Sequence, residues 1–396
     1  MMQISPETQL FIREHSSDDV RVLALQAKKY PDTDMPTAIT QIAGRKVAAE
    51  KIPSWWEIEK IWYPKHLSLE QCSSEITARY KARLLQGDSL TDLTGGFGID
   101  CSFLATGFKS ATYVERQEEL CEIAAHNFPV LNLNHINIKN EDGVTYLQAM
   151  SPVDCLFLDP ARRNEHGGKT VAISDCEPNV AELEELLLQK ANRVMIKLSP
   201  MLDLSLALKE LKQTQEVHIL SVNNECKELL ILLGQTSPTE ISIHCVNLST
   251  KGTQEEQHFV FTREQEQCSE CTYTDSLETY LYEPNASLLK AGAFRSIAAA
   301  YPVRKLHPNS HLYTSDTFIE NFPGRIFRIV NQCSFNKKEV KENLADLKKA
   351  NVTVRNFPAT VAELRKRIHL AEGGDTYLFA STLNNGQKVL IHCEKV

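Results

Sequence analysis

The feature that most constrains the fold is an alternation of short apolar runs and helical patterns between about Gly87 and Gly234. This alternation is typical of βα units, in which helices join parallel strands. The predicted strands are 89–93, 111–114, 136–138, 153–158, 193–198, 216–222 and 228–233, and the predicted helices are 99–106, 117–127, 144–150, 179–190 and 202–212. We therefore predict one open sheet of seven strands. The last two strands are joined only by Asn223 to Lys227, which favours an antiparallel hairpin.

The first predicted strand leads into a glycine-rich turn, Asp92-Leu93-Thr94-Gly95-Gly96-Phe97-Gly98-Ile99-Asp100. A sharp turn from strand to helix needs positive φ angles and lets a ligand approach the backbone, and glycine permits both. Three further carboxylates follow the next predicted strands: Glu115, Asp142 and Asp159. Because parallel strands end at a common edge where such folds bind ligands, we expect a nucleoside-cofactor site there.

The alternating region is flanked by segments of different texture. Residues 1–85 show apolar residues at helical spacing, and Ser73 and Ser74 precede a helix that we expect to run to about Leu85. The tryptophans 55, 56 and 62 are expected to pack this helical domain against its neighbour, although an exposed one could stack on a base. Beyond Gly234, strand patterns at 240–248 and 257–262 precede a helical pattern at 288–300. The remainder, from 326 on, has a β-α-β-α-β-β order with a hairpin turn at 384–386.

Charge is distributed unevenly along the chain. The formal net charge is −8, and residues 86–235 contain 12 Lys and Arg against 22 Asp and Glu. Residues 325–396 are basic, with 13 Lys and Arg against 7 Asp and Glu. This basic segment is either a solvated helix face or a surface that binds phosphates.

Composition also bounds the location and the metal content. No run of about 18 apolar residues occurs and the N-terminus lacks a signal pattern, so we expect a cytoplasmic protein without a membrane anchor. The eleven cysteines are expected to be reduced. Cys268 and Cys271 have a metal-like spacing, with His244, Cys245 and His258 as conceivable partners. A second ligand pair at regular spacing is missing, so we expect no metal site.

The glycine turn resembles the first motif of class I S-adenosylmethionine-dependent methyltransferases. The resemblance rests on Gly95, Gly96 and Gly98, preceded by an acid at Asp92. It implies that Asp92, Thr94 and the three glycines bind S-adenosyl-L-methionine. It further implies that Glu115 binds the ribose hydroxyls and that Asp142 lies near the adenine amino group. The segment Gln71 to Ser74 resembles a pre-core segment that closes over the cofactor in several RNA methyltransferases, which adds Ser74 to the expected cofactor contacts.

The fourth strand ends in Asp159-Pro160-Ala161-Arg162, which looks like the D/N-P-P-x motif of methyltransferases that act on nucleic-acid nitrogens. The resemblance implies that Asp159 and Pro160 hold the target amine. Ala161 replaces the second proline, and Arg162 stands where the family has an aromatic residue, so it is expected to stack on a base or bind a phosphate. Lys197 at the end of the next strand is an electrostatic helper, a contact to substrate phosphate or a strand-end salt bridge.

A covalent mechanism is disfavoured by the sequence. Methyltransferases that act on pyrimidine carbon need a cysteine nucleophile near one of these two strand ends. In this chain the corresponding positions hold Ala161 with Arg162 and the run 197–200, Lys-Leu-Ser-Pro. We therefore expect direct transfer to a nitrogen or oxygen.

The C-terminal segment resembles the THUMP-like domain of bacterial methyltransferases, through the runs 354–358, 363–368 and 372–378. With it, the resemblance covers nearly the whole chain. It implies an α/β fold with an N-terminal helical domain (1–85), a Rossmann-like seven-stranded methyltransferase core (86–235), a ferredoxin-like domain (236–324) and a THUMP-like domain (325–396).

These resemblances predict an RNA methyltransferase that acts on tRNA or rRNA without an obligate protein partner. Two alternatives stay open. One is a methyltransferase for a small molecule or protein, in which residues 325–396 serve dimerisation or scaffolding. The other is a non-catalytic RNA-binding protein that has retained the cofactor pocket.

Overall fold

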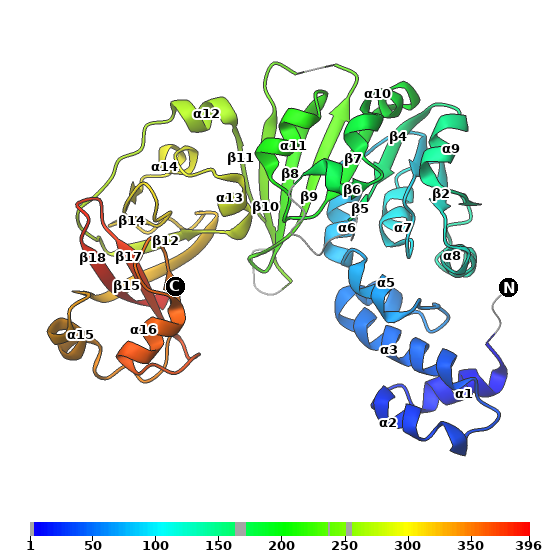
Figure 1. Cartoon of the computed structure of the whole chain (residues 1–396), viewed down its shortest axis with the longest axis horizontal. Coiled ribbons are helices and arrows are strands. Elements are labelled where there is room, and N and C mark those ends of the chain that lie inside the picture. The colour runs from blue at the N-terminus through cyan, green and yellow to red at the C-terminus, as the bar shows by residue number, and fades with distance from the viewer. Residues whose placement is uncertain (1–3, 163–171, 237, 251–255) are drawn as a thin grey trace. The chain divides into compact units, whose positions relative to one another are not determined.

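The structure is a computed structural model of the whole chain, and it describes residues 4–162, 172–236, 238–250 and 256–396. The chain forms two compact units (Figure 1). The first contains Met1–Gln215 and Leu229–Pro238, and the second contains Glu216–Glu228 and Thr239–Val396. Among the described residues, no helix is long and apolar enough to span a membrane. All eleven cysteines are free thiols, as expected.

The N-terminal part of the first unit is helical, as predicted. Its helices are α1 (Pro6–Glu14), α2 (Val20–Leu25), α3 (Met35–Lys51), α4 (Pro53–Trp56), α5 (His66–Gln71) and α6 (Glu75–Ala82), with a 3₁₀ turn at Ala27–Lys29. Ser5, Asp19 and Asp34 cap α1, α2 and α3 by accepting backbone N–H groups with their side chains. Proline occupies the first turn of α1, α3 and α4, where its missing N–H costs nothing.

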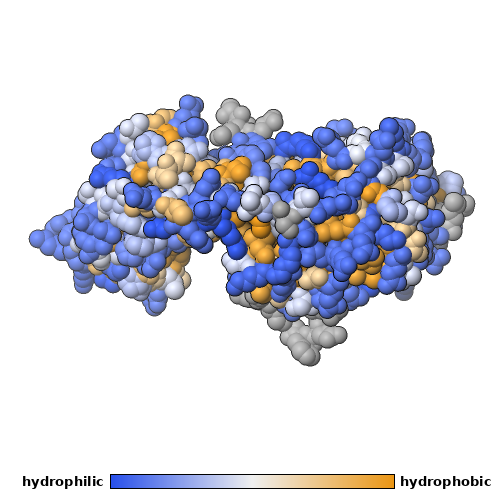
Figure 2. Space-filling view, turned by 90° about the horizontal axis from the view of Figure 1, so that it is seen from above, coloured by the Kyte–Doolittle hydropathy of each residue, from blue (hydrophilic) through white to orange (hydrophobic). Residues whose placement is uncertain are grey.

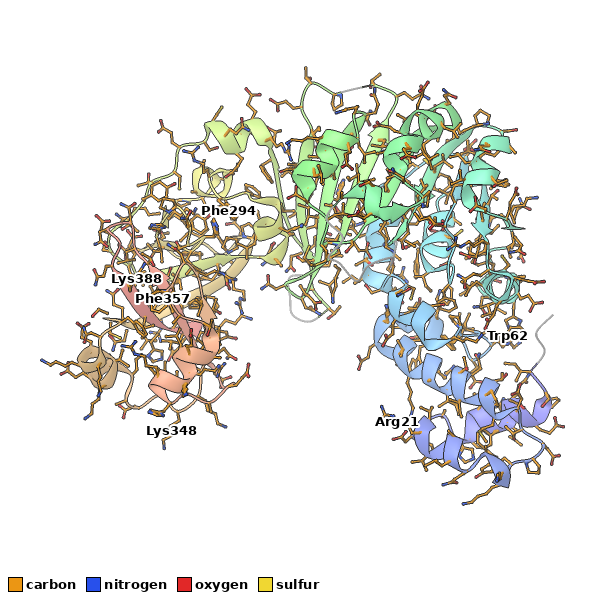
Figure 3. The ribbon with its side chains drawn as sticks, in the orientation of Figure 1. Arg21, Trp62, Phe294, Lys348, Phe357 and Lys388 are labelled. Atoms are coloured by element: carbon orange, nitrogen blue, oxygen red, sulfur yellow. The ribbon has the colours of Figure 1, made fainter. Side chains whose placement is uncertain are left out.

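These helices pack against the sheet domain through aromatic residues. Trp55 is buried and meets Phe97 of the glycine turn edge to face, with ring centroids 5.2 Å apart. Trp62, which is labelled in Figure 3, stacks on His126 with ring centroids 3.7 Å apart. Both therefore pack as predicted, whereas Trp56 is exposed beside Arg45.

Within the described residues the large sheet has nine strands, two more than predicted. Its order is β11-β10-β8-β9-β7-β4-β1-β2-β3 (Figure 1). The seven predicted strands are all present: β1 (Ser89–Asp92), β2 (Ser110–Glu115), β3 (Ile136–Asn140), β4 (Val153–Leu158), β7 (Ala191–Leu198), β8 (Thr214–Val222) and β9 (Glu225–Gly234). The two additional strands are β10 (Ser242–Leu248) and β11 (Glu256–Thr262). β10 pairs parallel to β8, so the domain boundary predicted at 235/236 falls between two strands of one sheet.

The connections follow the predicted βα order. Strands β3, β2, β1, β4 and β7 are parallel neighbours, and β9 is antiparallel to β7. The helices are α7 (Ile99–Ala105), α8 (Glu118–Val130), α9 (Gly143–Ala149), α10 (Val180–Lys190) and α11 (Leu204–Glu210). A small two-stranded sheet, β5 (Ala161–Arg162) with β6 (Cys176–Glu177), follows β4. This arrangement brings the carboxyl ends of β1, β2, β3, β4 and β7 to one edge.

The second unit contains a sheet of order β13-β14-β12-β15-β18-β17-β16. Its strands are β12 (Tyr280–Pro284), β13 (Arg304–Lys305), β14 (Tyr313–Ser315), β15 (Gly324–Ser334), β16 (Asn351–Val354), β17 (Thr376–Thr382) and β18 (Lys388–Lys395). β12 pairs with β15, so the predicted ferredoxin-like and THUMP-like segments share one sheet.

Five helices are described in this unit: α12 (Arg263–Cys268), α13 (Ala286–Ala291), α14 (Ser296–Ala300), α15 (Lys337–Leu344) and α16 (Val361–Ile368). The single helix expected at 288–300 is broken, because Gly292 adopts a left-handed conformation with φ 77° and ends α13. The hairpin between β17 and β18 turns at Gly386, as predicted.

Candidate functional site

Asp92 is the last residue of β1 and lies at the centre of the strand edge. Its side chain is buried, and the residue is 1% exposed. Oδ1 accepts the backbone N–H of Thr94 at 3.0 Å, but Oδ2 has no hydrogen-bond partner among the described residues. Burial, reinforced by the negative charges of Asp100 and Asp159, raises the pKa of Asp92 well above its usual range. A donor or cationic ligand would satisfy this oxygen, which is costly to leave unpaired.

The glycines of the turn serve different purposes. A Cβ at Gly95 would lie 2.2 Å from the ring of Tyr113, so this position has no room for a side chain. Gly96 has φ 53°, and a Cβ there would meet no atom closer than Thr94 O at 3.8 Å. Gly98 has φ 87° and starts α7. Packing therefore demands glycine at 95, while the space beside Gly96 is open to a ligand.

Glu115 ties the end of β2 to the glycine turn. Its carboxylate accepts the backbone N–H of Gly96 at 2.9 Å and that of Gln117 at 2.8 Å. The hydroxyl of Tyr113 donates to the carbonyl of Gly96 from the other side. These bonds fix the turn while each carboxylate oxygen keeps a second lone pair for a ligand hydroxyl.

Asp142 lies at the same edge and caps α9. Its Oδ1 accepts the N–H groups of Val144 and Thr145, each at 3.0 Å, and the side chain is exposed. A Cβ on the next residue, Gly143, would lie 2.2 Å from the carbonyl oxygen of Leu93. The start of α9 therefore packs directly against the end of β1, beside the glycine turn.

Asp159 and Lys197 follow β4 and end β7, two adjacent strands. Nζ of Lys197 lies 2.5 Å from Oδ2 of Asp159, so a strand-end salt bridge is among the interactions of this lysine. The side chain of Asp159 is 38% exposed, whereas that of Lys197 is 10% exposed. The backbone N–H of Asp159 donates to Oγ1 of Thr94 at 2.6 Å. Asp159 is thus held from two sides, with its carboxylate reaching solvent next to the glycine turn.

Behind Lys197 lies a buried polar network that the sequence analysis missed. Nζ of Lys197 is 3.2 Å from Oδ2 of Asp100, and Nζ of the fully buried Lys81 is 2.9 Å from Oδ1 of the same carboxylate. Ser73 donates from Oγ to Asp100 at 2.7 Å and accepts from Lys81 at 2.8 Å. Burial alone would raise the pKa of Asp100, but Lys197 and Lys81 hold it below its usual value.

The buried network contains Ser73, the neighbour of the predicted Ser74. Ser74 occupies the N-cap position of α6, but its side chain makes no capping hydrogen bond and contacts Thr77 Oγ1 at 3.3 Å. Ser73 reaches the strand edge instead. The sequence shows Asp100 as the last residue of the glycine turn. It also shows a lysine, Lys81, among apolar residues of the preceding helix, and a charge in such a place indicates a buried partner.

The remaining predicted target-site residues are only partly described. Pro160 is buried, and the backbone of Ala161 and Arg162 pairs with β6. The side chain of Arg162 lies outside the described residues, so its role stays a prediction. Among the described residues, those that could share a metal ion are Glu216, His218 and His244, a group that includes neither Cys268 nor Cys271.

The strand order of the large sheet, with antiparallel β9 between β7 and β8, and the glycine turn after β1 define a class I methyltransferase fold. Family models match the second unit: a ferredoxin-like domain at residues 280–323 and a THUMP domain-like segment at 324–395. A solved structure from Porphyromonas gingivalis W83, described as a "putative methyltransferase", is 33% identical, with all of both chains covered and a TM-score of 0.87. The chain therefore belongs to the family of class I methyltransferases that carry a C-terminal THUMP-like domain.

Other solved structures match a smaller part of the chain. An rRNA methylase from Streptococcus thermophilus is 14% identical and covers 40% of this chain and 93% of its own, with a TM-score of 0.30. A structure from Streptococcus mutans, described as a "putative methyltransferase" in complex with SAH, is 14% identical. It covers 40% of this chain and 96% of its own, and its TM-score is also 0.30. These scores are too low to support conclusions about this chain. No curated protein sequence matches it.

Proposed function

We propose that this protein transfers a methyl group from S-adenosyl-L-methionine directly to a base nitrogen in structured RNA, tRNA or rRNA. The observation that carries the proposal is the placement of Asp159. Its carboxylate is partly exposed, is fixed by Lys197 and is tied through Thr94 to the glycine turn. An acceptor for a target amine and the proposed cofactor loop are therefore held together as one rigid group.

The residues at the strand edge fit S-adenosyl-L-methionine. Asp92 offers a buried carboxylate oxygen without a partner among the described residues, which suits a cationic group. The space beside Gly96 lets a ligand touch the backbone, and Glu115 has acceptor capacity for two ribose hydroxyls. Thr94, Gly95, Gly98, Asp142 and Ser74 complete the proposed contacts. When bound, S-adenosyl-L-methionine would supply an electrophilic methyl group on a positively charged sulfur.

Asp159 is proposed to orient the target nitrogen. Lys197 engages Oδ2, and Oδ1 accepts no hydrogen bond from another described residue. An amine that donates one N–H to Oδ1 has its lone pair directed by that bond, and alignment of this kind supplies much of the rate of a direct transfer. In the transfer the nitrogen would form the new N–C bond with its lone pair while the methyl–sulfur bond breaks and S-adenosylhomocysteine leaves. The nitrogen would then release one proton, which Asp159 can accept and pass to water. Pro160 and Arg162 are proposed to contact the target base.

RNA is the proposed substrate because of the second unit. Five lysines of α15 and the segment after it are exposed, and among the described residues none of them forms an ion pair: Lys337, Lys338, Lys341, Lys348 and Lys349. Lys348 lies at the outer edge of this unit (Figure 3). The upper face of the chain, which is the face drawn in Figure 2, is also mostly hydrophilic. Unpaired exposed cations attract phosphates over long range. The proposal includes a cytoplasmic location, where such RNA is found.

A methyltransferase for a small molecule or protein remains the second candidate because several cations of the second unit are already paired. Glu283 binds Arg325 and also Arg355, the latter at 3.1 Å, and Arg328 lies 2.6 Å from Glu394. These pairs stabilise the sheet and are not available to RNA. The third candidate, an RNA-binding protein without catalysis, predicts cofactor binding with no methyl transfer.

The decisive experiment is a transfer assay on RNA from cells that lack the protein. Purified protein and labelled S-adenosyl-L-methionine are incubated with this RNA, and the digested nucleosides are identified by mass spectrometry. We expect one N-methylated nucleoside, absent with the Asp159→Ala variant. A well-folded protein that does not bind S-adenosylhomocysteine would contradict the cofactor assignment, and binding without any RNA product would favour the alternatives.

A further inference from the structure

Four side chains with metal-ligand chemistry gather on one face of the second unit. Glu216 and His218 come from β8, His244 from β10 and His258 from β11. The parallel register places His244 opposite His218, and Ser242 opposite Glu216. Because residues two apart on a strand project to the same face, strands β8 and β10 present these groups side by side. The cluster has no part in the proposed methyl transfer.

The spacing of these groups suits coordination. Nε2 of His218 lies 3.2 Å from Oε2 of Glu216, and the rings of His218 and His244 stack with centroids 4.3 Å apart. The ligand atoms of Glu216, His218 and His244 all lie within 4.8 Å of one another. Two ligands about 2.0–2.1 Å from a tetrahedral zinc ion are about 3.3 Å apart. The Glu216–His218 pair therefore already has about the required separation, and a ligand atom of His244 lies within 4.8 Å of both.

His244 is half-buried between the two other histidines, because its ring also stacks on that of His258 with ring centroids 5.3 Å apart. Nδ1 contacts Nε2 of His258 at 3.1 Å, which fixes the ring orientation in the way that outer hydrogen bonds orient metal-bound histidines. Within the described chain, Nε2 contacts only the hydroxyl of Ser242 at 3.1 Å, which can rotate away.

We propose that Glu216, His218 and His244 bind one divalent late transition-metal ion of the Zn²⁺ type. Two imidazoles and a carboxylate suit such an ion, whereas Mg²⁺ and Ca²⁺ prefer oxygen ligands alone. The side chain of Glu216 is 31% exposed, so a water molecule can reach the fourth position. The ion joins β8 to β10 and stabilises the strand pair that starts the second unit.

The experiment titrates the metal-free full-length protein with Co²⁺ and with Zn²⁺, and measures the cobalt spectrum and the thermal unfolding midpoint. We expect one equivalent of Co²⁺ bound through nitrogen and oxygen, with no thiolate charge-transfer band, and a rise of the midpoint with Zn²⁺. The matched control replaces the cysteine pair with metal-like spacing, Cys268→Ser with Cys271→Ser, and leaves both signals unchanged.

The ligand variants are His244→Gln and Glu216→Gln. Each is expected to abolish the cobalt signal and the thermal shift, and circular dichroism of the metal-free variants checks that they fold. Glu216→Gln keeps the shape of a partly exposed side chain, so it remains informative if His244→Gln does not fold. The proposal is overturned if the wild-type protein binds no Co²⁺, if binding survives Glu216→Gln, or if it is lost with the cysteine pair.

Discussion

The two compact units use their positive charges in opposite ways. In the first unit Lys81 and Lys197 are buried, and each lies within 3.2 Å of a carboxylate of the strand-edge network. In the second unit the lysines of α15 are exposed and, within the described chain, have no carboxylate at ion-pair distance. Buried charges with fixed partners hold atoms in place, whereas exposed charges act over distance and are screened by salt. Substitutions at the strand edge are therefore expected to cause large losses of activity. Substitutions in the basic surface, formed by the exposed lysines of α15 and of the segment after it, are expected to weaken RNA binding gradually.

The largest expected effect tests the strand edge. Asp159→Ala removes the partly exposed carboxylate of the network, so kcat is expected to fall by about 10²–10³-fold, as for the loss of one preorganised group. Binding of S-adenosylhomocysteine, measured by calorimetry, is expected to stay near the wild-type value. Asp159→Asn is the matched control, since it keeps an acceptor oxygen and is expected to lose less activity. Full activity of Asp159→Ala would remove Asp159 from the target site.

Gly96→Val tests whether the open space beside the turn is the cofactor site. The branched side chain would fill that space, and the φ of 53° adds strain, so affinity for S-adenosylhomocysteine is expected to fall about 100-fold or more. The control is Gly107→Val, where a Cβ meets nothing closer than 3.7 Å and the turn is untouched. Equal affinities of the two variants would place the cofactor elsewhere.

Substitutions of the exposed lysines in the second unit should have smaller effects, and these should be on RNA affinity. The combined change of Lys337, Lys341 and Lys348 to Ala is expected to weaken binding to structured RNA about tenfold at low salt. The slope of log affinity against log salt should also become shallower by about 0.7–0.9 for each phosphate that the variant no longer neutralises. Lys28→Ala with Lys29→Ala, an exposed basic pair in the first unit, is the control. Unchanged RNA affinity would support the small-molecule or protein alternative.

The smallest effect is a shift in pH dependence. Partial burial of its side chain, which is 38% exposed, raises the pKa of Asp159 above its usual value, although Lys197 partly opposes this. The carboxylate must be ionised to accept from the amine, so activity is lost as pH falls through this raised pKa, at a higher pH than for an ordinary Asp. A pH–rate profile of the wild-type protein should show this acid limb, and Asp159→Asn should lack it. An identical limb in both proteins would assign the titration to another group.

Local patterns predicted local structure well. The alternation of apolar runs located all seven strands of the core, because each strand is a short β-rich run between turn residues. The fold class followed from the glycine turn and the acid at Glu115. Pairing between distant segments was not visible in this way: β10 and β11 were predicted as strands, but their place in the large sheet was not, because only the fold brings β10 beside β8. Tyr280–Pro284 was overlooked as a strand, since it is short and ends in proline.

In the candidate site, too, the residues placed by local patterns were predicted, and those brought together by packing were not. Asp92, Glu115 and Asp159 were predicted because each follows a strand, and strand ends converge by topology. Lys81 and Ser73 come from the N-terminal helices, and their meeting with Asp100 depends on how α6 packs against α7. No spacing in the sequence encodes that contact.

The path of β9 has a consequence for how the protein can be divided. Residues Leu229–Gly234 complete the first unit by pairing with β7, but the chain reaches them only after passing through Glu216–Glu228 of the second unit. A chain shortened after Pro238 would keep β8 without β10, its parallel partner, and would expose the backbone edge of a largely buried strand. Such an edge invites aggregation. The methyltransferase fold and its C-terminal extension are therefore interleaved, and the extension cannot be removed without leaving the catalytic half with an open edge.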